Sequence, residues 1–149
     1  MHSQTLSRSY PSTFASVSHA RHAVIEFAQQ CRLAPADIAD LALAAGEAFN
    51  NAVEHGHVEG GTFHLRCDCD EQGVHVRVWD KGKGFSYSGQ LQVVDPQHRG
   101  VRGLGIFLMR SLMDDVEYDV SSKGTHVSLT KRWREDQCMC EPDESLSAR

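Results

Sequence analysis

The most constraining feature of this sequence is the stretch Glu47–His55, which places polar side chains at helical spacing. Glu47, Asn51 and His55 recur every four residues, so in a helix they lie along one side. The stripe beside them is apolar and consists of Ile38, Leu41, Ala45, Ala48 and Ala52. Because such a stripe packs on a core, the pattern predicts a long amphipathic helix with a carboxylate and a carboxamide at the edge of a groove.

Length and composition favour one soluble domain. The chain has 149 residues, of which 40% are apolar and 23% are charged. Its formal charge is −5 without a basic block, which argues against binding nucleic acid by neutralising phosphates. The first residues lack a signal-peptide pattern, and no apolar run is long enough to cross a bilayer. We therefore expect a cytoplasmic protein with one domain over residues 1–134 and an acidic, disordered tail over 135–149.

The cysteines do not indicate a disulfide framework. Their number is odd, and a chain without an export signal is expected in a reducing compartment. They form two Cys-x-Cys pairs and a single residue, namely Cys67 with Cys69, Cys138 with Cys140, and Cys31. This spacing differs from the Cys-x-x-Cys spacing of zinc sites, so a metal site here is not predicted.

Hydrophobic periodicity predicts an α+β fold. Alternation predicts a strand at 4–10, a hairpin at 62–69 and 73–80, and a closing hairpin at 116–120 and 125–133. Helical spacing predicts a helix from Pro11-Ser12 to about Cys31 and another from Pro35 to about His55, where Gly56 supplies a left-handed cap. This order gives a two-layer sandwich, in which a mostly antiparallel mixed sheet carries helices on one face.

The segment from Lys81 to about Arg102 has little regular pattern and several glycines. Structureless stretches of this length are uncommon inside a compact domain and often form lids, so we expect a lid that nucleotide orders. Helical spacing resumes at Leu104.

Asp80 ends a strand of apolar neighbours, where a carboxylate needs hydrogen-bond donors. The exocyclic amino group of adenine is such a donor, whereas guanine presents a repelling carbonyl at that position. Gly82 and Gly84 would let the backbone approach a flat base. An ordinary turn after a strand would explain all three residues as well.

Gly100, Gly103 and Gly105 precede and open the next helix. Free amides at a helix N-terminus, together with its positive dipole end, bind phosphate, and Arg99 and Arg102 would add cationic donors. A glycine-rich loop with a solvated charged rim is the simpler interpretation. The segment is neither a Walker A loop nor a dinucleotide fingerprint.

Asn51 could offer its carbonyl oxygen to Mg²⁺, which takes few protein ligands and fills its shell with phosphates and water. Glu47, one turn earlier, would then lie near a metal-bound triphosphate as a base for a hydroxyl or water nucleophile. Taken singly, each is more commonly a solvent-facing residue of an amphipathic helix. His55 is best explained as a helix-terminal histidine favoured by the dipole.

The order of these motifs is more specific than any one of them. Over residues 35–132 the chain resembles the ATPase superfamily of gyrase, Hsp90, histidine kinases and MutL, also called the GHKL or Bergerat-fold superfamily. Within it, Glu47–Gly56, Leu104–Val116 and Lys123-Gly-Thr125 are most similar to the small anti-sigma-factor serine/threonine kinases.

This resemblance implies a role for each residue. Glu47 would be the catalytic base, Asn51 the Mg²⁺ ligand and Asp80 the adenine anchor. The other implied nucleotide-binding residues are Gly82 and Gly84 at the base, Gly103, Leu104 and Gly105 at the phosphates, and Thr125 supporting Asp80. Either Arg99 or Arg102 would reach the γ-phosphate.

By the same resemblance, the chain would use ATP and Mg²⁺ to phosphorylate a serine or threonine of a small STAS-like anti-sigma factor antagonist. It would regulate transcription by partner switching with a sigma factor, act as a homodimer, and contact neither nucleic acid nor membrane. Two alternatives remain: a nucleotide-gated binding module without transfer, and a detached histidine-kinase ATPase domain. The second is disfavoured because such domains usually carry Asn in place of Glu47.

Overall fold

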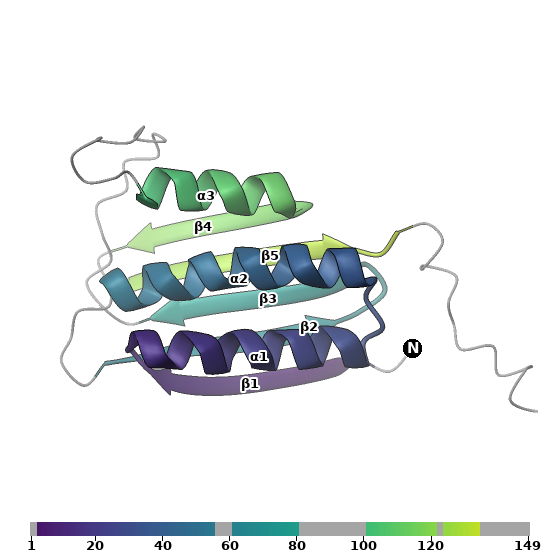
Figure 1. Cartoon of the computed structure of the whole chain (residues 1–149), viewed down its shortest axis with the longest axis horizontal. Coiled ribbons are helices and arrows are strands. Elements are labelled where there is room, and N and C mark those ends of the chain that lie inside the picture. The colour runs from purple at the N-terminus through teal and green to yellow at the C-terminus, as the bar shows by residue number, and fades with distance from the viewer. Residues whose placement is uncertain (1–2, 56–60, 81–100, 122–123, 135–149) are drawn as a thin grey trace, which may run out of the picture.

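The computed structural model describes residues 3–55, 61–80, 101–121 and 124–134. These form two layers, with three helices on one face of a five-stranded sheet (Figure 1). The helices are α1 (Phe14–Gln30), α2 (Pro35–His55) and α3 (Val101–Leu112). The strands are β1 (Gln4–Pro11), β2 (Thr62–Cys69), β3 (Gly73–Asp80), β4 (Asp115–Ser121) and β5 (Gly124–Arg132).

The sheet has the strand order β1-β2-β3-β5-β4, and every pairing between the five described strands is antiparallel. The expected α+β sandwich, with helices on one face of a mostly antiparallel sheet, is confirmed. Both hairpins and the first strand also lie where alternation predicts them. The last of the described strands, β5, lies between β3 and β4, so its pairing completes the middle of the sheet.

The first two helices begin at the residues that favour a helix start. Thr13 caps α1 because its hydroxyl accepts a hydrogen bond from the Ser16 amide at 3.4 Å. Pro35 is the first residue of α2, where its missing N–H and fixed φ suit the helix. Arg32, at φ 64°, turns the chain between the two helices.

The core lies between the helix layer and the inner face of the sheet. It holds the apolar stripe of α2, including Leu41, Ala45, Ala48 and Phe49, all at most 1% exposed. On β3 the alternating residues Val74, Val76 and Val78 are buried against it. Each fully buried Val, Leu or Phe side chain contributes about 1.5–3 kcal/mol, so this packing fixes the position of α2 over the sheet.

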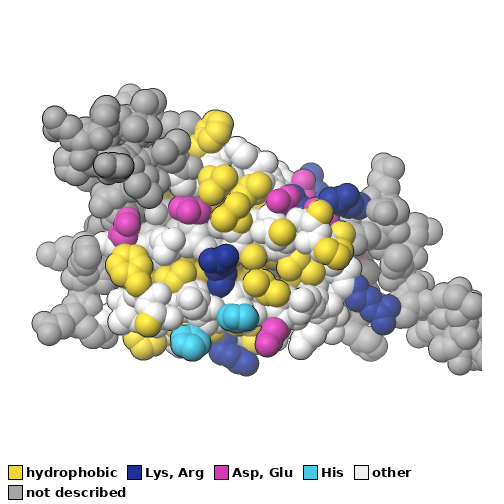
Figure 2. Space-filling model, in the orientation of Figure 1, with side chains coloured by type: hydrophobic (Ala, Val, Ile, Leu, Met, Phe, Trp, Pro, Cys, Tyr) yellow, Lys and Arg dark blue, Asp and Glu magenta, His cyan; other side chains and the backbone are white. Residues whose placement is uncertain are grey.

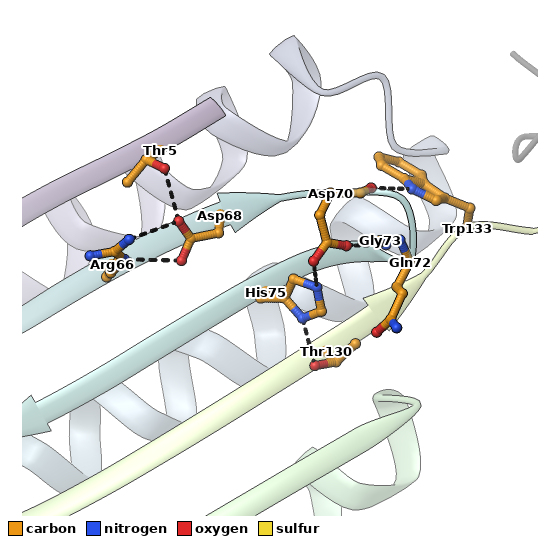
Figure 3. Close-up of polar contacts among 9 residues, drawn as sticks. All are labelled: Thr5, Arg66, Asp68, Asp70, Gln72, Gly73, His75, Thr130 and Trp133. Atoms are coloured by element: carbon orange, nitrogen blue, oxygen red, sulfur yellow. Dashed lines mark hydrogen bonds and ion pairs between the residues drawn. The ribbon is translucent and has the colours of Figure 1, made fainter. Parts of the chain in front are cut away.

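A polar network closes the turn between β2 and β3 (Figure 3). Asp70 Oδ1 accepts hydrogen bonds from the Gln72 and Gly73 amides at 2.8 and 3.3 Å. The other carboxylate oxygen lies 3.0 Å from His75 Nε2, and the Trp133 indole donates to the Asp70 carbonyl at 2.9 Å. A Cβ at Gly73 would lie 2.1 Å from the Lys131 carbonyl oxygen, so only glycine fits there.

An ionic cluster joins the start of α2 to the end of β5. Asp37, 3% exposed, accepts two hydrogen bonds from Arg134 at 2.9 and 3.0 Å. Lys131 Nζ lies 3.9 Å from Asp37 and 3.5 Å from Asp40, and it also donates to the Leu112 carbonyl. The cluster therefore connects α2, β5 and the end of α3.

The start of α3 differs from expectation. The helix begins at Val101, three residues before the predicted start at Leu104. Glycine is unfavourable in a helix, so Gly103 and Gly105 made the first turn of α3 unrecognisable from the sequence. The rest of the expected lid, residues 81–100, and the expected tail, residues 135–149, lie outside the described residues. Within the described residues, no helix is long and apolar enough to span a membrane.

Candidate functional site

Helix α2 brings Glu47 and Asn51 to the boundary between the helix layer and the sheet. They are one turn apart, and the intervening Ala48 and the following Ala52 are buried in the core. Asn51 is 3% exposed, whereas Glu47 is half-buried. The predicted carboxylate and carboxamide therefore do line one edge of the helix.

Helix α3 approaches this edge most closely at Gly105. A Cβ at position 105 would lie 3.0 Å from Glu47 Oε2 and 3.9 Å from Asn51 Nδ2. A separation of 3.0 Å is shorter than ordinary van der Waals contact, so a side chain there would displace the carboxylate. The glycine thus lets the backbone of α3 approach Glu47 more closely than a residue with a side chain would allow.

Asp80 and Thr125 lie next to each other at the ends of β3 and β5. The residues Trp79 and His126 are Cα partners, and Asp80 and Thr125 are the adjacent positions on the two strands. Both are buried, 5% and 4% exposed respectively. Since α2 packs on both strands, these polar residues lie beneath the helix that carries Asn51.

Two buried polar atoms in this region lack a hydrogen-bond partner among the described residues. They are Nδ2 of Asn51 and Oγ1 of Thr125. Leaving a buried polar atom unsatisfied costs about 1–3 kcal/mol. A bound ligand, ion or water that forms the missing hydrogen bond removes this cost. Asn51 can therefore donate to a polar ligand beside Glu47 and Gly105, and Thr125 can bond to one beside Asp80.

Burial raises the pKa of Glu47 above its usual value, and the negative charge of Glu54 raises it further. A carboxylate with a raised pKa is a better proton acceptor when it is ionised. Sequence reasoning did not single out Glu54. The seven-residue spacing of Glu47 and Glu54 was the available signal, because it places both on one side of α2, two turns apart.

The predicted site residues fall into two groups. The structure brings together Glu47, Asn51 and Gly105, and it places Asp80 beside Thr125. Arg102, Gly103 and Leu104 belong to the first turn of α3, where only the backbone is described, and His55 is the last residue of α2. Gly82, Gly84 and Arg99 lie outside the described residues.

The helix layer around the site carries exposed apolar side chains. Phe107 of α3 is 60% exposed and Leu43 of α2 is 45% exposed. Figure 2 shows hydrophobic side chains spread over this layer, with acidic and basic groups between them.

Comparison with known proteins identifies the family of the chain. The family described as "Histidine kinase-like ATPase domain" matches residues 10–131. The "Serine-protein kinase RsbW" of Halalkalibacterium halodurans is 33% identical over 108 residues, covering 68% of this chain and 66% of the relative. The protein of the same name from Staphylococcus aureus strain MSSA476 is 32% identical over 111 residues, covering 68% and 69%. The chain thus spans about two thirds of the length of these relatives.

Two solved structures share the fold. A crystal structure of the RsbU and RsbW domains of a Mycobacterium tuberculosis protein has a TM-score of 0.62 and 20% identity, covering 87% of this chain and 32% of that one. The histidine kinase domain of a blue-light-activated kinase from Erythrobacter litoralis has a TM-score of 0.50 and 20% identity, covering 69% and 46%.

The matched residues include the three helices, strands β2 to β4, nearly all of β5, and Glu47 and Asn51, but only the end of β1. From the family match and the RsbW relatives together, the chain belongs to the histidine kinase-like ATPase family, in its RsbW group.

Proposed function

We propose that this protein is a Mg-ATP-dependent serine/threonine kinase of the anti-sigma-factor type. The observation that carries the proposal is the juxtaposition of Glu47, Asn51 and Gly105 at the contact of α2 with α3. This arrangement brings a proton acceptor and a metal ligand against the first turns of α3, whose backbone amides would hold a phosphate. The RsbW relatives are named serine-protein kinases, which supports the same activity.

Asn51 would hold Mg²⁺ through its side-chain carbonyl, and the orphaned amide nitrogen would be free to donate to a phosphate oxygen. When bound, Mg²⁺ neutralises charge on the transferring phosphoryl group. The first turn of α3, with Gly103, Leu104 and Gly105, would direct backbone amides at the phosphates. We assign the γ-phosphate contact to Arg99 or Arg102.

Asp80 would anchor adenine by accepting a hydrogen bond from its amino group, with Thr125 supporting that carboxylate. The burial of both residues supports this assignment, since a carboxylate in an apolar setting requires donors. Gly82 and Gly84 would shape the pocket for the base. A lid over residues 81–100 would exclude water during transfer.

Glu47 would accept the proton of the acceptor hydroxyl during phosphoryl transfer. A serine hydroxyl must lose a proton as it attacks, whereas a histidine nitrogen needs no base, which favours a serine or threonine acceptor. The raised pKa of Glu47, caused first by burial and then by Glu54, suits this role. Positioning by α2 would supply most of the remaining catalysis.

The acceptor would be a small STAS-like anti-sigma factor antagonist, and a sigma factor would be the alternative partner. The exposed Phe107 and Leu43 on the two helices that hold the site support docking of a protein substrate there. Homodimerisation and a cytoplasmic location complete the proposal, by similarity to the RsbW group.

The test measures radiolabelled phosphate transfer from ATP to a STAS-like antagonist, in parallel with nucleotide binding by calorimetry. Glu47→Ala should keep nucleotide affinity near that of the parent and reduce transfer about 10²–10⁴-fold. Asn51→Ala should lose both. The matched control is Glu117→Ala, which removes an exposed carboxylate on β4. If the parent binds Mg-ATP and the antagonist without transferring phosphate, a nucleotide-gated binding module replaces the kinase.

A further inference from the structure

The face of the sheet without helices, which we call the open face, has an ordered charge pattern. The three helices cover the other face (Figure 1), and alternate residues of each strand project from the open face. On β4 these residues are Asp115, Glu117 and Asp119, all exposed, whereas the residues between them pack toward the core. On β3 they include Arg77, which is exposed on a strand whose alternate valines are buried. A basic strand and an acidic strand therefore share one surface.

Arg77 lies in an unfavourable position within its own chain. Its Cα partner on β2 is Arg66, so two arginines occupy directly opposed positions. Like charges in such positions are destabilising. Arg66 is paired with Asp68 at 3.0 Å (Figure 3), whereas Arg77 forms no ion pair within the described residues. A carboxylate from another molecule would therefore stabilise Arg77.

Glu117 lies in the same row of the sheet but does not pair with Arg77. The register joins Arg77 to Ser128 and Ser128 to Glu117, so β5 separates the two charges. Strands lie about 4.8 Å apart, which puts the two charged residues about 10 Å apart. Because side chains stand roughly perpendicular to a sheet, these two project side by side. Over the part of the chain that the structure describes, Glu117 forms no ion pair either.

A hollow of about 320 Å³ lies between the two charges. Basic side chains of β3 form one wall, carboxylates of β4 form the other, and small hydroxyl side chains of β5 form the floor. The main lining residues are His75, Arg77, Asp115, Glu117, Ser128 and Thr130. The hollow is therefore complementary in charge to a surface that carries the same two walls in the opposite order.

We propose that the open face binds a second copy of this chain, with the two-fold axis parallel to β5 and passing over it. Rotation about this axis places β3 over the partner's β4 and β4 over the partner's β3. Each Arg77 then faces the partner's Glu117, so the isologous interface contains this ion pair twice. The inference rests on the homodimer of the proposed function and adds the surface that forms it.

Face-to-face packing brings the paired groups within reach. Packed sheets lie about 10 Å apart, and the long side chains of an arginine and a glutamate that point toward each other span this gap. On the axis β5 packs on its own copy, where Ser128 and Thr130 are small enough for the sheets to approach. Trp79 and His126, whose rings are 6.1 Å apart, add apolar surface at one end. Because packed sheets are rotated by about 30°, the central row of Arg77 aligns best.

Charge disfavours the other symmetric way of stacking two open faces. A two-fold axis perpendicular to the strands would place every strand over its own copy. The three carboxylates of β4 would then face the partner's carboxylates in any register. Like charges brought together across an interface are strongly unfavourable, so the axis along β5 is the arrangement that the surface supports.

The contact area predicts a weak dimer that is sensitive to salt. Three strands of each chain overlap, namely β3, β5 and β4, which gives a patch of about 14 Å by 23 Å. Such a patch is at the lower end of the sizes found for specific interfaces. The ion pairs at its centre are screened by salt. We therefore expect the dimer to dissociate on dilution and at high ionic strength.

The test measures the association of the full-length protein by sedimentation velocity over a concentration series at low salt. The parent should change from monomer to dimer as its concentration rises, and added salt should raise the Kd. Arg77→Glu and Glu117→Arg should each raise the Kd at least about 100-fold, because each creates two like-charge contacts per dimer. The matched control Arg110→Glu reverses an exposed charge on α3 and should leave the Kd unchanged.

A mixture of the two single variants gives the sharpest measurement. Equimolar Arg77→Glu and Glu117→Arg should form a heterodimer with a Kd near that of the parent. In this heterodimer the introduced glutamate faces the introduced arginine, and the remaining Arg77 and Glu117 face each other. The double variant Arg77→Glu/Glu117→Arg should dimerise as well, because its pairs are only exchanged. Misfolding of either variant would not produce this rescue.

Three results would overturn the proposal: a parent that stays monomeric at every concentration, a single variant that dimerises like the parent, or a mixture that does not associate. None of them bears on phosphate transfer, because Glu47 and Asn51 lie on the helix-covered side of the sheet. A parent that dimerises through the open face but transfers no phosphate would instead overturn the kinase and leave this interface in place.

Discussion

Gly105 of α3 and Glu47 of α2 approach so closely that a Cβ at position 105 would lie 3.0 Å from the Glu47 carboxylate. The effect of replacing Gly105 on the stability of the helix can therefore be separated from its effect on the position of Glu47. Replacing the glycine should strengthen the helix itself, because glycine is about 1 kcal/mol less favourable than alanine in a helix interior. It should at the same time displace the group that we assign as the catalytic base.

Gly105→Ala should therefore reduce phosphate transfer at least about 10-fold, since even small displacements of a catalytic group slow a reaction. The free energy of unfolding, measured with urea, should stay within about 1 kcal/mol of the parent. The control is Gly46→Ala, where the added Cβ would meet the flexible Arg21 side chain at 3.2 Å. Equal activity of Gly105→Ala and the parent would remove Gly105 from the site.

Glu54→Gln should shift the pH dependence of phosphate transfer. Burial and then the Glu54 charge raise the Glu47 pKa above its usual 4.5. The rate of transfer should therefore rise with pH as Glu47 ionises, and this acid limb of the pH profile should lie above pH 4.5. Removing the Glu54 charge should move the acid limb to lower pH, while burial keeps it above pH 4.5. Rates of transfer across an acidic pH series measure the shift. A limb that does not move would show that Glu54 does not influence the base.

The same pKa has a defined effect on stability. Because the folded-state pKa of Glu47 exceeds the unfolded value near 4.5, folding favours the protonated carboxyl. This contribution is fully present below pH 4.5 and is lost as pH rises through the folded-state pKa. In urea unfolding, the free energy of unfolding of the parent should fall over that pH window relative to that of Glu47→Gln. A difference between the two proteins that is independent of pH would contradict the shift.

Asp80→Asn should weaken ATP binding about 10–100-fold, which corresponds to losing a charge-assisted hydrogen bond of roughly 1.5–3 kcal/mol. The parent should bind ATP much better than GTP, because a carboxylate repels the guanine carbonyl. Calorimetry with both nucleotides measures this preference, and Asp119→Asn, an exposed change on β4, is the control. Equal affinities of the parent for ATP and GTP would exclude Asp80 from the base pocket.

Asp37→Ala should destabilise the fold by about 2–4 kcal/mol, because it removes the buried carboxylate that accepts from Arg134 and leaves the nearly buried Lys131 with only Asp40 and the Leu112 carbonyl. Arg134→Gln should cost less, since the Arg134 side chain is 54% exposed and Lys131 still neutralises Asp37. Urea unfolding measures both, with Asp40→Asn as a control on the exposed side of the cluster. A larger loss from Arg134→Gln than from Asp37→Ala would contradict this account.

Local patterns were sufficient to predict the elements and their layering. Alternation at 62–69 and 73–80 predicts a hairpin, and Pro35 marks the start of α2, because both signals depend on near neighbours in the chain. The start of α3 was misplaced since Gly103 and Gly105 contradict helix propensity locally. Packing against α2 outweighs that preference.

The candidate site was predictable in part. Glu47 and Asn51 share one helix, so their spacing alone brings them together. The approach of Gly105 to Glu47 and the bond between Asp37 and Arg134, which are 97 positions apart, depend on tertiary packing that no periodicity encodes.

The insertion of β5 between β3 and β4 has a consequence for the protein during its synthesis. Residues 73–79 of β3 leave the ribosome long before their partners at 126–132, so one edge of β3 stays open until β5 has been synthesised. That strand carries Val74, Val76 and Val78, and an open apolar edge readily pairs with other chains. We expect the nascent protein to depend on chaperones until β5 has been synthesised. Truncations before residue 132 should aggregate.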